Sequence, residues 1–166
     1  MAEQPRTKEQ RKADTLARLG AAVADVWVAT TDGVRPFLVP LTMAWVGERI
    51  ALATEGTAPT VRNLQAHGRA RIALGGTRDV VRIDAVLERT IPVAEAAGIG
   101  AAYATQNDWD PREAGPPYVF ALLRPERIEA WREENEFRGR LLMRDGVWLV
   151  QGPGRRSPRP AGCGRE

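Results

Sequence analysis

Apolar and polar residues alternate in several short stretches of the chain, and turn-forming residues separate these stretches. Alternation with a period of two is typical of strands that bury one face. Alternation is clearest in residues 49–54 and 80–89. Together with short apolar runs between turn residues, it predicts strands over residues 26–30, 37–44, 49–54, 69–74, 80–89, 118–123 and 127–131, and a last hairpin over residues 140–150. Because the links between the early strands are too short for helical crossovers, we expect antiparallel pairing.

Three other segments are predicted to be helices. Residues 7–23 carry apolar side chains at intervals of three and four, which predicts an N-terminal helix that packs on the rest of the chain. A second helix should start near Thr57 or Ala58 and end at His67 and Gly68, where a cation-capable residue and glycine are favoured. The alanine-rich residues 92–105 are expected to form the third.

Together these elements predict a mainly β chain with helices, of the α+β class, folded as a small antiparallel barrel with helical decoration. A chain of 166 residues can close one core of this size. We divide it into an N-terminal helix (residues 1–23), a barrel domain (residues 24–150) and a disordered basic tail (residues 151–166).

The net charge of +3 originates in the tail, where arginines outnumber acidic residues, while acidic and basic residues balance before it. The high pI of about 9.6 therefore does not favour a nucleic-acid partner. Lys8 and Lys12 are the only lysines, so a fixed anion site in the barrel must use arginine or backbone N–H groups.

The single cysteine, Cys163, has no partner for an internal disulfide, which fits a reducing compartment. No apolar run approaches the roughly 20 residues of a membrane span, and the first residues are too charged for a secretory signal. We therefore expect a cytoplasmic protein without a membrane partner.

The start of the second helix is a candidate anion site. Thr57 can cap the helix and Pro59 fits its first turn, so free backbone N–H groups would face the end of the preceding strand. Arg62 could add a forked positive charge, and Thr54 and Thr60 could add hydroxyl donors. Alternatively, Thr57 only caps a surface helix and Arg62 is a solvated charge.

The order of six short segments resembles the split β-barrel family, which includes pyridoxamine 5′-phosphate oxidase-like flavoproteins and reductases that use the deazaflavin coenzyme F-420. The segments are VPL at 39–41, IALAT at 50–54, TVRNL at 60–64, ARIAL at 70–74, VVRID at 80–84 and PERIEAW at 125–131. The resemblance extends from about residue 24 to residue 150. It implies a homodimer that binds a flavin or deazaflavin in a groove between the subunits.

In such a dimer the cofactor ring lies beside one strand, and the next strand and helix hold its phosphate. The resemblance implies the following cofactor-binding residues: Val39, Pro40, Leu41 and Thr42 at the ring, Thr54, Thr57, Thr60, Arg62 and Asn63 near the phosphate, and Arg82 as a further contact. Trp109, Tyr118 and Trp131 could line the substrate pocket or the dimer interface. Plain packing is the alternative for these aromatic residues.

The departures from the family pattern narrow the function. Vitamin B6 oxidases in this family use a late Arg-x-His motif and several basic residues on FMN, whereas His67 is the only histidine here. Its place before Gly68 is typical of a helix end, and one histidine with one tail cysteine does not predict a metal site. Asp84 and Ala85 stand where many relatives have glycine.

The leading hypothesis is an oxidoreductase that transfers hydride between a bound cofactor and a small organic acceptor, with the catalytic residues unassigned. The cofactor is FMN or the deazaflavin F-420, and the depleted set of basic residues favours deazaflavin. A non-catalytic protein of the same fold that binds or carries flavin, deazaflavin or haem is the alternative. A nucleic-acid or interaction protein that acts through its tail is a weaker third hypothesis.

Overall fold

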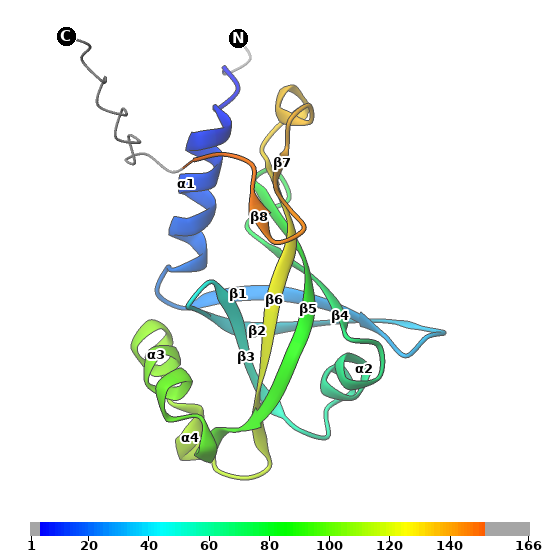
Figure 1. The fold of residues 1–166 in the computed structure, drawn as a ribbon, viewed down its shortest axis with the longest axis vertical. Coiled ribbons are helices and arrows are strands. Elements are labelled where there is room, and N and C mark those ends of the chain that lie inside the picture. The colour runs from blue at the N-terminus through cyan, green and yellow to red at the C-terminus, as the bar shows by residue number, and fades with distance from the viewer. Residues whose placement is uncertain (1–3, 152–166) are drawn as a thin grey trace, which may run out of the picture.

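Six antiparallel strands form a closed barrel at the centre of the computed structural model, which describes residues 4–151 (Figure 1). The strands are β1 (Ala24–Thr31), β2 (Pro36–Val46), β3 (Arg49–Glu55), β4 (Arg69–Leu74), β5 (Val80–Pro92) and β6 (Tyr118–Trp131). They follow the order β3-β2-β1-β4-β5-β6, and pairing of β3 with β6 closes the barrel. Two short strands, β7 (Leu141–Arg144) and β8 (Val147–Trp148), extend the sheet beyond β6. The expected α+β split-barrel architecture is confirmed.

The alternating pattern of β1 shows how the sequence builds this barrel. Ala24, Val26 and Val28 are buried, whereas Asp25 and Trp27 between them are exposed. The inward side chains of all six strands meet in one apolar core. Its fully buried members include Val28, Leu52, Ile72, Ile83 and Leu123.

The strand β6 differs from the two separate strands predicted over residues 118–123 and 127–131. It runs without interruption for 14 residues through Pro125. Proline has no N–H to donate and is tolerated in a sheet at bulges. The β5–β6 register shifts between Asp84 and Ala85, and Pro125 is the partner of Ala85, so the irregularity lies at the proline.

The first helix, α1 (Lys8–Leu19), is shorter than the predicted segment 7–23. Thr7 and Gln10 form a capping box at its start, in which each side chain accepts a hydrogen bond from the other residue's backbone N–H. Beyond Gly20 the chain turns, and Val23 adopts a φ of 53°, which a right-handed helix cannot contain. The buried face of α1 carries Arg11, Thr15 and Leu19, so two of its three buried residues are polar.

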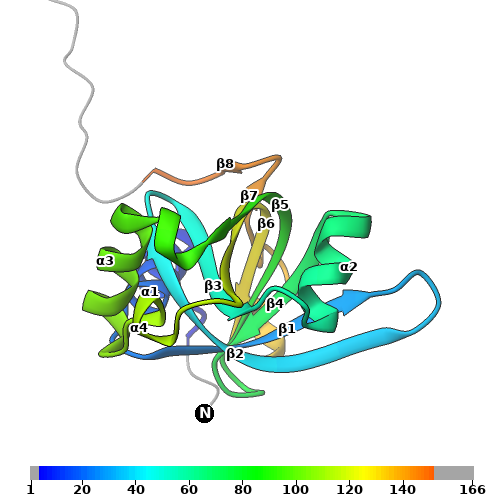
Figure 2. The same ribbon diagram turned by 90° about the horizontal axis from the view of Figure 1, so that it is seen from below.

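The remaining helices cover the barrel at two places. The helix α2 (Pro59–His67) packs against β1, while α3 (Ala97–Asn107) packs against β2 with the short α4 (Pro111–Ala114) beside it (Figures 1 and 2). Two 3-10 turns, η1 (Val93–Glu95) and η2 (Glu134–Glu136), complete the described elements. The third predicted helix thus begins later than residue 92, because β5 continues to Pro92. Past α2, β1 and β2 continue as a two-stranded arm that projects from the barrel.

Each helix in the described range 4–151 is too short or too polar to cross a membrane. The predicted disordered tail lies outside the described residues except for Gln151.

Candidate functional site

A cavity of about 440 Å³ lies where β2 and β3 meet the end of α3, and we call it the aromatic pocket. Six residues predicted from the sequence meet there. They are Pro40, Leu41, Thr42, Thr54, Trp109 and Tyr118. Asp25, Ala53 and Tyr103 complete the lining. Residues that are more than 60 positions apart in the chain are therefore brought to one place by the barrel.

Three aromatic rings form one side of the aromatic pocket. The ring centroids of Tyr103 and Trp109 lie 6.0 Å apart at 73°, and those of Trp109 and Tyr118 lie 6.1 Å apart at 75°. Such edge-to-face contacts are favourable for aromatic rings. Trp109 remains 42% exposed, so part of its surface is open to a ligand.

Tyr103 is the buried member of this group. Its hydroxyl donates a hydrogen bond to the backbone oxygen of Thr42 over 2.9 Å. Burial, helped by the negative charge of Asp25, raises the pKa of Tyr103 to about 12. The tyrosine therefore stays neutral near pH 7 and anchors α3 to β2.

Two amide side chains at the end of α3 strengthen this anchor. Asn107 donates to the backbone oxygen of Met43 over 3.0 Å and accepts from the N–H of Ala24 over 3.3 Å. Gln106 accepts from the N–H of Trp45 over 2.9 Å and donates to the backbone oxygen of Leu19 over 2.8 Å. Asn107 was not predicted to have this role, because its partners are distant in sequence.

Asp25 is the charged residue of the aromatic pocket and was not among the residues predicted from the sequence. The hydroxyl of Thr42 donates to Asp25 Oδ1 over 2.7 Å. The two residues are direct partners in the β1–β2 ladder. The alternating pattern of β1 does indicate that Asp25 lies on the outer face. The sequence does not show that Asp25 pairs with Thr42 on β2.

The start of α2 is the second part of the candidate site. Its N-cap is Ala58 and no side chain caps it, so the predicted capping by Thr57 is wrong. The first-turn N–H groups are consequently not bonded to a capping side chain. Only a few residues separate this helix start from Thr54 in the aromatic pocket.

The predicted phosphate residues on α2 divide into two groups. Thr60 and Asn63 are only 4% and 6% exposed, and the amide of Asn63 donates to the hydroxyl of Thr30 over 3.1 Å. Thr57 and Arg62 are exposed. Within residues 4–151, the guanidinium of Arg62 has neither an ion pair nor a hydrogen bond. Arg62 is therefore available to an anion, whereas Asn63 already serves the fold.

Val39, which was predicted to contact the cofactor ring, faces the interior of the barrel. It is the ladder partner of the buried Val28 and packs against the main core. Its neighbour Pro40 is exposed on the outer face. The period-two alternation of β2 therefore offers Pro40 and Thr42, not Val39, to a ligand outside the barrel.

Arg82 and Trp131 lie apart from the aromatic pocket. Register partners connect Pro40 to Trp27, Trp27 to Ala73 and Ala73 to Arg82. Arg82 is therefore three strands from Pro40, about 14 Å at the usual strand spacing. Its guanidinium forms an ion pair with Glu129 and lies 5.6 Å from the ring centre of Trp131.

The guanidinium of Arg82 is engaged by Glu129, a buried carboxylate that binds several arginines. The side chain of Glu129 is 2% exposed and also forms ion pairs with Arg127 over 2.7 Å and Arg140 over 3.5 Å. Burial alone would raise the pKa of Glu129, but hydrogen bonds from Arg127 and Arg82 hold it below its usual range. A cofactor contact by Arg82 stays a prediction.

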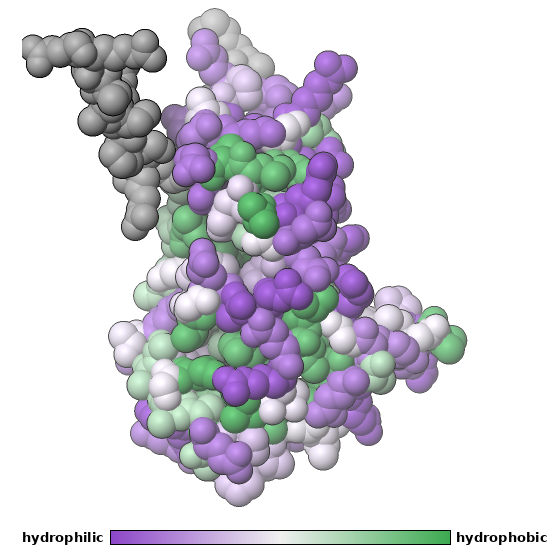
Figure 3. All heavy atoms as spheres, in the orientation of Figure 1, coloured by the Kyte–Doolittle hydropathy of each residue, from purple (hydrophilic) through white to green (hydrophobic). Residues whose placement is uncertain are grey.

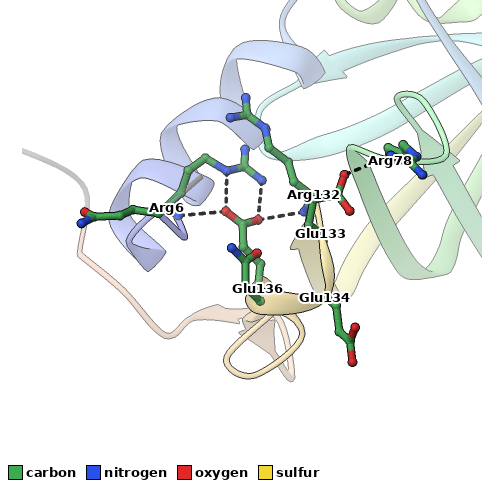
Figure 4. Close-up of a pocket in the computed structure, with 8 residues that line it drawn as sticks. Arg6, Arg78, Arg132, Glu133, Glu134 and Glu136 are labelled. Carbon is green, nitrogen blue, oxygen red and sulfur yellow. Dashed lines mark hydrogen bonds and ion pairs between the residues drawn. The ribbon is translucent and has the colours of Figure 1, made fainter. Parts of the chain in front are cut away.

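A larger cavity, of about 800 Å³, lies between the N-terminal segment and the turn after β6, and we call it the charged hollow (Figure 4). Arg6 forms a forked contact with Glu136, with 3.0 Å from Nε to Oε1 and 2.8 Å from Nη2 to Oε2. The backbone N–H of Arg132 donates to Glu136 Oε2 over 2.8 Å. These hydrogen bonds, those of Arg6 first, lower the pKa of Glu136 to about 2.

Four charged side chains of the charged hollow thus pair with one another, Arg6 with Glu136 and Arg78 with Glu133. Glu136 is only 3% exposed, and even the exposed Arg78 forms an ion pair with Glu133 over 3.6 Å. The network ties the segment before α1 to η2. We interpret the charged hollow as a structural contact, although it is the larger cavity.

Potential metal ligands do not gather in the part of the chain that the structure describes. Residues 4–151 contain no cluster of three or more His, Cys, Asp or Glu side chains suited to a metal ion. His67 is the last residue of α2, and Gly68 follows it in the left-handed conformation with its N–H bonded to the oxygen of Leu64. His67 does not line the aromatic pocket.

No protein-family model matches the sequence, and no curated protein sequence matches it. Solved structures do resemble the fold. An F-420 reductase is 19% identical with a TM-score of 0.53, over 68% of this chain and 93% of that protein. A heme binding protein from Mycobacterium smegmatis is 20% identical with a TM-score of 0.61, over 87% of this chain and 60% of that protein.

A FAD-binding protein from Mesorhizobium loti is 15% identical with a TM-score of 0.57, over 75% of this chain and 92% of that protein. At such low identities the similarity concerns the arrangement of the backbone. It agrees with the closed antiparallel barrel and the strand order found here. The chain therefore has the split-barrel fold that these proteins share.

Proposed function

We propose that this protein is an oxidoreductase that binds a flavin or deazaflavin and transfers hydride to or from a small organic acceptor. One observation carries the proposal. The aromatic pocket and the uncapped start of α2 are joined by the short connection after Thr54, so a flat ring and an anionic tail could be held together. The names of two structural neighbours, an F-420 reductase and a FAD-binding protein, support the same cofactor class.

The residues present fit the two ends of such a cofactor. Pro40 and Thr42 on the outer face of β2 would support the ring, and the hydroxyl of Thr54 would be a further donor. Arg62, exposed and without an ion pair among residues 4–151, would hold the phosphate with Thr57 and the first-turn N–H groups.

The same residues favour deazaflavin over FMN. Thr60 and Asn63 are buried, which leaves Arg62 as the charged member of the predicted phosphate group. The described site contains no lysine. A phosphate site with one exposed arginine matches the sequence-based preference for F-420.

A flavin or deazaflavin supplies the hydride chemistry, and the chain supplies position and surroundings. The rings of Trp109 and Tyr118 would exclude water from one side of the acceptor. Tyr103 would hold α3 and β2 at a fixed separation through its hydrogen bond to Thr42. Its raised pKa makes it a poor source of a phenolate near pH 7.

We also propose a homodimer, because part of the outer face of β1 and β2 is apolar. Trp27 is 52% exposed and Leu38 is 62% exposed, and their ladder partners are Pro40 and Ala29. In Figure 2, β1 and β2 lie on the side of the barrel away from β8. The face shown in Figure 3 instead mixes polar and apolar groups.

A partner on the outer face of β1 and β2 would cover these apolar side chains and border the aromatic pocket through Pro40. Sedimentation of the purified chain should give twice the mass of 18.2 kDa. A monomer at micromolar concentration would remove this part of the proposal.

The decisive experiment mixes the full chain with FMN and, separately, with reduced F-420. Fluorescence measures binding, and a panel of acceptors then tests oxidation of the bound cofactor in its reduced form. We expect one cofactor to bind with a Kd below about 100 μM, roughly −5.5 kcal/mol. Failure of both to bind would end the enzyme proposal.

The variant Arg62→Ala tests the anchor. Loss of a charge-assisted contact to phosphate should weaken cofactor binding by roughly 1.5–3 kcal/mol. Arg138→Ala is the matched control, because Arg138 is also exposed and has no ion pair among the described residues. Unchanged affinity in Arg62→Ala would return Arg62 to the role of a solvated surface charge.

A non-catalytic carrier of the same fold is the second candidate. The observation that favours it is the absence, among the residues lining the aromatic pocket, of a paired acid and base. The backbone similarity to a heme binding protein adds haem to the possible cargo. The carrier predicts tight binding without oxidation by any acceptor in the panel.

A further inference from the structure

We propose that the molecule accepted by the aromatic pocket is an organic cation, with a protonated or quaternary amine next to an apolar body. As a statement about the acceptor, this inference rests on the proposed function. The underlying feature is independent of any cofactor: the aromatic pocket combines three aromatic rings with one carboxylate.

The formal charge of the aromatic pocket is negative. Asp25 is the only ionisable acid or base, apart from the two tyrosines, among the described residues that line it. Arginine, lysine and histidine are missing from this lining. A cation entering the pocket meets attraction without a competing positive side chain, while an anion meets repulsion.

The carboxylate of Asp25 is held in place and still has a free oxygen. Thr42 donates its hydroxyl to Oδ1 over 2.7 Å. The other oxygen, Oδ2, accepts no hydrogen bond from the residues that the structure describes. An N–H donor of a ligand can therefore bond to Oδ2 without breaking an existing contact.

The aromatic rings supply the second half of the recognition. Trp109 and Tyr118 meet at an angle of 75°, so their faces point in different directions, and the fully buried Tyr103 packs against Trp109 at 73°. Ring faces carry partial negative charge and attract ammonium groups, and tryptophan does so most strongly. Rings and carboxylate thus favour the same kind of ligand.

The charges of the site are separated in a way that suits two ligands. Arg62 lies on α2, outside the lining of the aromatic pocket, where the cofactor phosphate is proposed. Asp25 lies on β1 at the pocket itself. An anionic cofactor tail and a cationic acceptor would each meet the opposite charge.

Three soluble probes of similar shape test the inference: benzylamine, which is cationic at pH 7, neutral benzyl alcohol and anionic benzoate. Calorimetry and chemical-shift changes on the full chain measure their binding without cofactor. We expect benzylamine to bind at least about ten times more tightly than benzyl alcohol, and benzoate to bind most weakly. Equal binding of the amine and the alcohol, or no binding of benzylamine up to about 10 mM, would overturn the inference.

The variant Asp25→Asn keeps the shape and the acceptor for Thr42 but removes the charge. It should reduce the preference for benzylamine to less than about threefold. Asp145→Asn is the matched control, since Asp145 is exposed at the β7–β8 turn with a φ of 52° that asparagine tolerates. A preference that persists in folded Asp25→Asn would contradict the role of Asp25.

A parallel titration with FMN and F-420 separates this inference from the proposed function. Cofactor binding without a preference for benzylamine would refute the cationic acceptor and leave the oxidoreductase intact. A preference for benzylamine without binding of either cofactor would refute the oxidoreductase and support a protein that binds organic cations.

Discussion

The aromatic pocket and the charged hollow differ in how far their polar groups satisfy one another. The charged hollow is larger, at about 800 Å³ against about 440 Å³, and richer in charged side chains. Yet the buried carboxylate of Glu136 already has Arg6 and the N–H of Arg132 as partners. In the aromatic pocket, Asp25 keeps one oxygen open and Trp109 keeps an exposed surface.

This difference separates a contact that holds the fold from a site that can bind. Buried charges that pair within the chain cost desolvation energy and offer little to a ligand, because a ligand must first break the existing pair. A carboxylate oxygen without a partner, beside aromatic rings, can bind a ligand without breaking an existing pair. Size and charge alone would select the charged hollow as the functional site.

The largest effect is expected for Arg6→Ala, which leaves Glu136 buried without its main partner. The free energy of unfolding should fall by roughly 2–4 kcal/mol, measured by chemical denaturation at pH 7. Arg78→Ala is the control in the same hollow, because Arg78 is 86% exposed and its pair should contribute less than about 1 kcal/mol. Equal losses in both variants would show that the charged hollow is not organised around Glu136.

Acid should remove the contribution of Glu136. Its folded pKa of about 2 lies below the usual 4.5, so its stabilising effect is fully present above about pH 4.5 and is lost as the pH falls toward 2. The stability difference between the wild type and Glu136→Gln should be roughly 1–3 kcal/mol at pH 6 and should shrink below pH 4. A difference that stays constant from pH 6 to pH 3 would contradict the lowered pKa.

A smaller effect, on binding rather than stability, is expected for Trp109→Ala. Removal of the most exposed ring of the aromatic pocket should weaken binding of the proposed cofactor or acceptor by roughly 1–2 kcal/mol. The free energy of unfolding should change by less than about 1 kcal/mol. Phe137→Ala is the control, since Phe137 is an exposed aromatic residue outside the aromatic pocket. Equal affinity in wild type and Trp109→Ala would move the binding site elsewhere.

Much of the fold could be predicted from local pattern. The strand β4 has the predicted bounds, and α2 ends at His67 and Gly68 as expected. The residues within and next to these elements determine their bounds. The pairing of β3 with β6, which closes the barrel, joins segments far apart in sequence and could be expected only through the family resemblance.

The candidate site was predicted less completely, because it depends on register and side-chain partners. Alternation places Arg82 outside the barrel but does not reveal that Glu129 is its ladder partner. The TVRNL segment suggested that Asn63 binds phosphate, but its amide donates to Thr30. Asp25 was overlooked because its importance appears only when β1, β2 and α3 come together.

A cofactor titration of two arginine variants tests the proposed binding site most directly. We propose that the cofactor binds between the aromatic pocket and the start of α2. Arg62→Ala should weaken binding of FMN or F-420 at least tenfold, whereas Arg82→Ala, once shown to be folded, should change it less than about threefold. Strong loss in Arg82→Ala with normal binding in Arg62→Ala would contradict the claim and place the cofactor over β5.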